Sequence, residues 1–66
     1  MALRPVELMR RDLEWLRRIR EDWQLAYEHA TEQGKRDVAE LCGKQIAFFD
    51  FLIKRAEEFL KTDSNQ

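Results

Sequence analysis

Few side chains in this sequence could act as a nucleophile, an acid–base catalyst or a metal ligand. It contains one cysteine, Cys42, and one histidine, His29, whereas a zinc site needs about four ligands. The single cysteine also excludes an intramolecular disulfide. Its two glycines, Gly34 and Gly43, do not form a phosphate-binding loop. We therefore expect no enzyme, no cofactor and no metal site.

Two polar residues, Asp12 and Gln45, stand among apolar neighbours. Catalysis by Asp12 would need a second acid or base and a pocket, and the sequence indicates neither. We instead predict that both residues are core polar groups that fix the register of packed helices. In that role Asp12 would pair with Arg55, and Gln45 would accept the indole N–H of Trp23. The alternative for Asp12 is a water-exposed position at one end of a bundle.

The arginines near the start of the chain are the candidate contacts for nucleic acid. Residues 4–20 have a net charge of +3, and residues 21–33 have a net charge of −4. The basic half could follow a phosphate backbone through its candidate residues Arg10, Arg11, Arg17 and Arg18. Interleaved glutamates neutralise this patch, and no aromatic side chain is clearly placed to stack on bases. A nucleic-acid-binding helical bundle is therefore the second functional hypothesis.

The spacing of helix-breaking residues predicts an all-α chain with two long helices. Pro5 suits the first turn of a helix, and Gly34 suits a left-handed helix end. We predict one domain, residues 1–66, with helices over about 5–33 and 36–61, a turn at about 34–35 and a frayed tail at 62–66. So short a turn makes the helices antiparallel, with numbers of facing residues that sum to about 68.

The second helix has more apolar surface than one neighbouring helix can cover. Its apolar arc spans roughly 160° at 100° per residue, whereas a coiled-coil seam is narrower. Phe51 lies outside the arc, as Leu25 does on the first helix, and is either a docking residue or part of an oligomer core. The predicted partner or oligomer interface consists of Trp15, Phe48, Phe51, Ile53 and Leu60.

The charge polarity of the first helix favours pairing with an antiparallel copy of itself. The hairpin is therefore expected to dimerise into a four-helix bundle. The overall balance of 12 basic and 13 acidic residues gives no general attraction to nucleic acid or anionic membranes. Without a signal peptide or a membrane span, the expected location is the cytoplasm. We expect a small non-enzymatic regulator or adaptor that acts as a homodimer on an unidentified protein partner.

Overall fold

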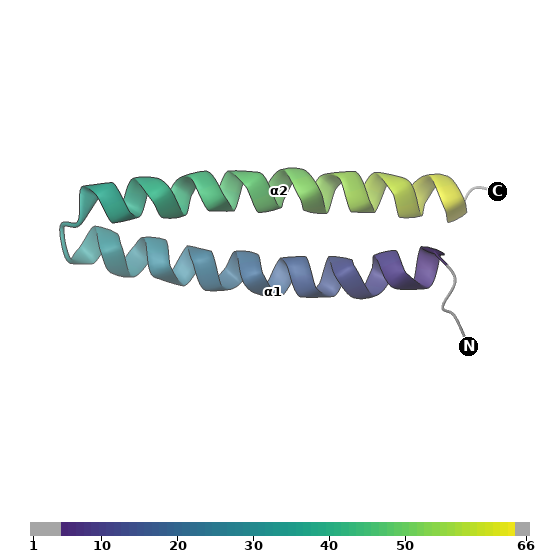
Figure 1. Cartoon of the computed structure of the whole chain (residues 1–66), viewed down its shortest axis with the longest axis horizontal. Helices are drawn as coiled ribbons and strands as arrows, with labels where there is room; N and C mark the ends of the chain where they lie inside the picture. The colour runs from purple at the N-terminus through teal and green to yellow at the C-terminus, as the bar shows by residue number, and fades with distance from the viewer. Residues whose placement is uncertain (1–4, 65–66) are drawn as a thin grey trace.

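The chain folds as an antiparallel hairpin of two long α-helices (Figure 1). This computed structural model describes residues 5–64, and the side chains of residues 5–62. Helix α1 spans Pro5–Glu32 and helix α2 spans Arg36–Ser64. The predicted all-α fold with two packed helices is confirmed. Helix α2 continues past residue 61, so residues 62–64 are helical rather than part of a frayed tail, and residues 65–66 lie outside the described range.

Gly34 forms the turn between the helices through a Schellman motif. Its φ of 71° lies in the left-handed region that glycine adopts without a steric penalty. The amide of Lys35 donates to the carbonyl of Ala30 at 2.9 Å, and the amide of Gly34 donates to the carbonyl of Thr31 at 3.1 Å. The carbonyl of Lys35 accepts the amide of Ala39 at 2.9 Å, so Lys35 is the N-cap of α2. The chain therefore reverses direction within three residues.

The helices meet along a heptad-spaced seam, in which contact residues alternate at intervals of three and four positions. All of these residues are buried or half-buried except Tyr27, which is 38% exposed. The seam consists of Val6, Met9, Leu13, Leu16, Arg20, Trp23, Tyr27 and Ala30 on α1, and Ala39, Cys42, Ile46, Phe49, Ile53, Ala56 and Leu60 on α2.

The register of the seam lies close to the pairing rule expected for facing residues. Arg20 binds Asp50, and a Cβ atom on Gly43 would lie 3.7 Å from the ring of Tyr27. Both pairs have residue numbers that sum to 70, against the expected value of about 68.

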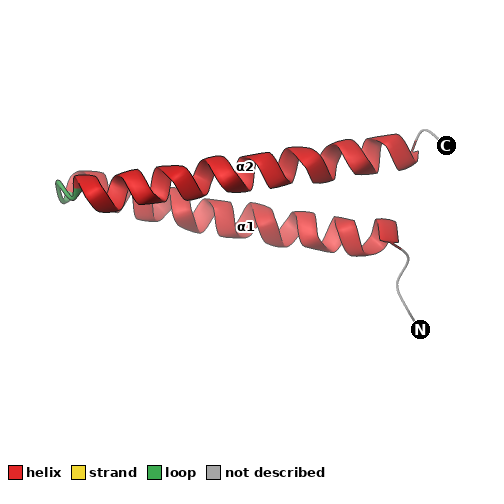
Figure 2. Cartoon of the chain, turned by 45° about the horizontal axis from the view of Figure 1, so that its top comes forward, coloured by secondary structure: helices red, strands yellow, loops and turns green. Residues whose placement is uncertain are grey.

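The hairpin is a single layer of two helices with a very small core. The molecule measures 48 × 23 × 12 Å, and Figure 2 shows that the two helix axes are inclined to each other. Among the described residues, the buried hydrophobic side chains are those of Leu13, Ala30, Cys42 and Ala56, and three of these four are small. A chain of this size has little stability to spare. Because the core is so thin, most of the apolar surface has no packing partner within the hairpin.

Candidate interaction surface

One side of the seam is polar and is closed by two ion pairs. This polar flank consists of Arg17, Gln24, Gly43, Asp50 and Glu57, which follow the seam residues on both helices. The Nη2 of Arg17 donates to Oε2 of Glu57 at 2.7 Å. One turn away on α1, Arg20 donates from both Nε and Nη2 to the carboxylate of Asp50.

The ion pair with Asp50 also affects the pKa of Arg20. The hydrogen bond to Asp50, together with the charge of that carboxylate, raises the pKa of Arg20 above its usual value. Arg20 therefore carries its charge at every pH at which the protein can be studied.

The opposite side of the seam is an apolar surface that the hairpin does not cover. Trp15 is 61% exposed, Leu41 55% and Phe48 53%. Shallow grooves run along this side, one of them between Asp12 and Leu52 and another between Leu8 and Trp15. We call this surface the open flank, and it consists of Leu8, Asp12, Trp15, Ile19, Asp22 and Ala26 on α1, and Val38, Leu41, Gln45, Phe48, Leu52, Arg55 and Phe59 on α2.

Helical geometry explains why the two flanks differ. In an antiparallel pair of helices, the positions on one side of each seam face the equivalent positions of the other helix. The ion pair between Arg17 and Glu57 shows which side of each helix lies on the polar flank. Residues that follow a seam residue by one position lie on the polar flank. Apolar residues that precede a seam residue by one position must then lie together on the opposite side. The exposed rings of Trp15 and Phe48 consequently lie on the same side of the hairpin.

The total surface area reflects the elongated shape of the hairpin. The accessible surface of the chain is 5631 Å², whereas a compact monomer of 8.0 kDa is expected to expose about 4,500 Å². The hairpin thus exposes roughly 1,000 Å² more total surface than a compact protein of its mass, in keeping with its extents of 48 × 23 × 12 Å.

The predicted interface residues fall in three different environments. Trp15 and Phe48 lie on the open flank, and the ring of Phe48 contacts that of Phe49 edge-to-face, with 5.6 Å between the ring centroids. Ile53 and Leu60 belong to the seam and are half-buried, so a second surface would cover only the part of each side chain that α1 leaves exposed.

Phe51 lies apart from both the seam and the open flank. It is 57% exposed. The guanidinium carbon Cζ of Arg55 lies 5.8 Å from the centroid of its ring, at a distance typical of a cation–π contact. The side chain of Phe51 is thus available to a partner that does not occupy the open flank.

The two predicted core polar residues lie on the open flank instead of in the seam. Asp12 is exposed in the single hairpin, so its core role would require a second packed surface and stays a prediction. Asp12 and Arg55 line one groove together with Ala56. No ion pair forms between these two described side chains, and the guanidinium of Arg55 lies over the ring of Phe51. Gln45 is half-buried and makes no hydrogen bond to Trp23. Both polar groups therefore belong to the surface that remains to be covered.

The four predicted nucleic-acid-contacting arginines do not form one patch. Arg10 and Arg17 lie toward the polar flank, where Arg17 is already paired with Glu57. Arg11 and Arg18 lie on the other side of the row of glutamates. They share a shallow groove with Glu14 and the ring of Trp15. An aromatic side chain therefore does lie beside two arginines, contrary to the sequence-based expectation, although a carboxylate lies in the same groove.

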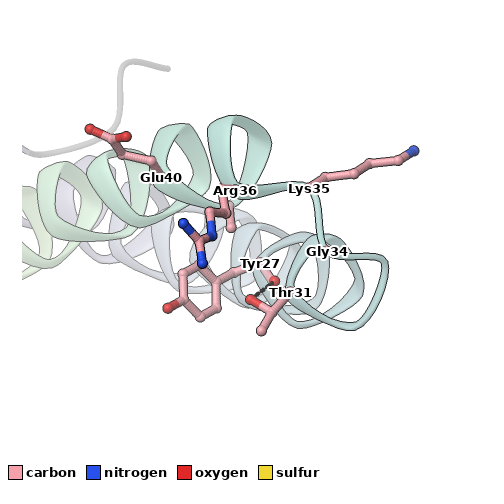
Figure 3. A pocket seen from close by; sticks show the side chains of 7 residues that line it. Tyr27, Thr31, Gly34, Lys35, Arg36 and Glu40 are labelled. Atoms are coloured by element: carbon pink, nitrogen blue, oxygen red, sulfur yellow. Dashed lines mark hydrogen bonds between the residues drawn. The ribbon is translucent and has the colours of Figure 1, made fainter.

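A further hollow, separate from the grooves described above, lies at the turn between the end of α1 and the start of α2 (Figure 3). The hydroxyl of Thr31 donates to the carbonyl of Tyr27 at 2.9 Å. The side chain of Arg36 extends toward the ring of Tyr27, whereas Lys35 points away from it. The residues that line this hollow are Tyr27, Thr31, Gly34, Lys35, Arg36, Ala39 and Glu40.

Neither helix has, within its described residues, an apolar stretch long enough to cross a membrane. In the same part of the chain, no three side chains of the metal-ligating types lie together. No family model, no curated protein and no solved structure matches this chain. The class that the structure itself defines is an all-α helical hairpin with one closed and one open flank.

Proposed function

We propose that this chain is a small non-enzymatic regulator or adaptor that acts through protein–protein interaction as a helical homodimer. The observation that carries the proposal is the open flank, on which Trp15, Leu41 and Phe48 are each more than half exposed. Small domains that lack disulfides and metals commonly obtain their stability from oligomerisation. Two hairpins packed through this flank would form a four-helix bundle, the usual arrangement for antiparallel helices with short turns.

The dimer would act on another protein through residues that remain outside the bundle. Phe51 is the candidate for this role, since it lies off both the seam and the open flank. Large aromatic side chains are enriched at the centres of protein interfaces. The free thiol of Cys42 is compatible with a reducing compartment, and we place this activity in the cytoplasm.

The test is to measure the mass of the protein in solution and then to replace Phe51 with alanine. We expect a dimer whose mass is unchanged in Phe51→Ala, with a loss in unfolding free energy of about 1 kcal/mol or less, because only an exposed cation–π contact is removed. Binding to the protein partner should be lost in Phe51→Ala and retained in Leu25→Ala, which removes an equally exposed side chain.

Two results would contradict the proposal. A monomer at all concentrations would exclude the homodimer. Dissociation of the dimer in Phe51→Ala would place Phe51 in the oligomer core and remove its docking role.

The groove beside Trp15 favours one second candidate, a nucleic-acid-binding helical bundle. Arg11, Arg18 and Trp15 line one groove together with Glu14, and arginines next to an aromatic ring are a common way to bind a single strand. Binding of a labelled single-stranded RNA should then fall steeply with salt and be lost in the double variant Arg11→Ala, Arg18→Ala. Equal binding by this variant would exclude the nucleic-acid function.

A further inference from the structure

We infer that the open flank is covered by a second copy of this chain in inverted orientation, so that α1 packs against α1 and α2 against α2. The two turns then lie at opposite ends of the bundle. This inference rests on the proposed homodimer and adds the identity of the occupant and the orientation in which it binds.

The surface area of the hairpin fits an occupant of the same size. The chain exposes roughly 1,000 Å² more than a compact monomer of its mass. If each of two copies buried this excess, the interface would total roughly 2,000 Å², which lies at the lower end of the range for permanent dimers. A short peptide could not cover a flank that extends along most of both helices.

The charges on the helices decide between the two possible orientations. Residues 5–20 of α1 have a net charge of +2, and residues 21–32 have a net charge of −4. In α2, residues 36–50 have a net charge of −1, and residues 51–64 have none. The inverted orientation places the positive half of each α1 against the negative half of the other. The parallel orientation would instead place the −4 half of α1 against the −1 half of α2.

Full overlap of the two hairpins places the two-fold axis near the middle of α1, between residues 18 and 19. Ile19 is the open-flank residue closest to that axis, and it meets its own copy. Trp15 lies opposite Asp22 of the second copy, where its indole N–H finds a carboxylate acceptor while its ring is buried. Residue numbers of facing positions on the two copies of α1 thus sum to 37.

The experiment compares single cysteines in a Cys42→Ala background, under mild oxidation. Disulfide formation requires two Cα atoms within about 7 Å. In the inverted dimer the two copies of Ile19→Cys satisfy this condition. The matched control Leu8→Cys also lies on the open flank, but its two copies are about 32 Å apart along the axis. We expect Ile19→Cys to form covalent dimers at least about tenfold faster than Leu8→Cys.

A second measurement leaves the open flank unchanged. Spin labels on Glu32→Cys, an exposed position next to the turn, report the distance between the two turns. The inverted orientation predicts about 40 Å from the helical rise, and the parallel orientation predicts roughly half that distance. The labelled protein should also have the mass of two chains in sedimentation.

Each outcome bears on a different part of the proposal. A dimer with fast Ile19→Cys crosslinking and a long distance between the turns supports the inverted orientation. A dimer with a short distance and equal crosslinking rates overturns this orientation but leaves the proposed homodimer in place. A protein with the mass of one chain at micromolar concentration overturns both.

Discussion

The two flanks of the same seam differ in chemistry and in how well the chain covers them. On the polar flank, Arg17 and Arg20 extend from α1 to Glu57 and Asp50 on α2. These ion pairs are about half exposed, so they bridge the helix edges without needing a further layer. On the open flank, rings and aliphatic side chains meet solvent directly. The hairpin therefore bridges its own helices on the polar flank, but it leaves the apolar side chains of the open flank exposed to solvent.

This contrast shows which surface limits the stability of the isolated chain. Half-exposed ion pairs each contribute about 1 kcal/mol or less. Fully burying a leucine or phenylalanine side chain contributes about 1.5–3 kcal/mol. The hairpin gains the ion pairs on its polar flank. On the open flank, most of the free energy available from burying apolar side chains is not gained by the isolated chain. We expect changes on the open flank to have much larger effects on assembly.

The largest effect is expected from a charge on the open flank, in Phe48→Glu. In the proposed dimer this side chain is covered, and an unpaired buried carboxylate is costly. We expect the dimer dissociation constant to rise at least about 100-fold, which corresponds to about 2.7 kcal/mol. Sedimentation over a range of protein concentrations measures it. The helical circular dichroism signal should also fall at low concentration.

Leu25→Glu is the matched control for this substitution. Leu25 is 64% exposed, against 53% for Phe48, but it lies off the open flank. We expect its dissociation constant to change less than about tenfold, because an exposed surface substitution seldom costs more than about 0.5 kcal/mol. Equal weakening by both substitutions would show that the open flank is not the surface on which the chains meet.

Much of the hairpin could be predicted from local signals in the sequence. Gly34 is the only left-handed residue in the described part of the chain, and the turn forms where its position predicts it. Pro5 is the first residue of α1, in keeping with the suitability of proline for the first turn of a helix. These signals act within one helical turn, so no knowledge of the partner helix is needed to interpret them.

The division of the apolar arc between two surfaces could not be predicted in the same way. An arc of roughly 160° contains both the seam and the open flank, and the periodicity alone does not say which residues contact α1. The contacts of Arg20 with Asp50 and of Arg17 with Glu57 show how each helix is rotated about its axis, and the sequence does not contain this information. The apolar pattern alone therefore predicts a core position for Asp12, although this residue lies one position outside the seam.

An intermediate effect is expected on the polar flank from Gly43→Ala. A Cβ atom at this position would lie 3.7 Å from Cε2 of Tyr27, which is an ordinary van der Waals contact. Alanine is favoured over glycine inside a helix by about 1 kcal/mol. The free energy of unfolding from urea denaturation should therefore rise by about 1 kcal/mol, with no change in oligomeric mass. A loss of the dimer would mean that Gly43 lies at the interface between chains and not on the polar flank.

The smallest effect is expected from breaking an ion pair, measured in a double-mutant cycle of Arg20→Gln and Asp50→Asn. Both side chains keep their approximate shape, so the cycle isolates the charge interaction. We expect a coupling free energy smaller than the effect of Gly43→Ala, because the pair is partly exposed to water.

The dependence of this coupling on salt and pH tests the same description of the polar flank. Added salt should reduce the coupling free energy, because exposed charges are screened. A rise in pH from 7 to 10 should leave it unchanged, because the pKa of Arg20 is raised above its usual value. Stability from a raised pKa is lost only as the pH rises through the folded-state pKa, which lies beyond that range. A coupling above about 2 kcal/mol that resists salt would indicate that the pair is desolvated. In that case a second chain would cover the polar flank, and the two flanks would differ less than the hairpin suggests.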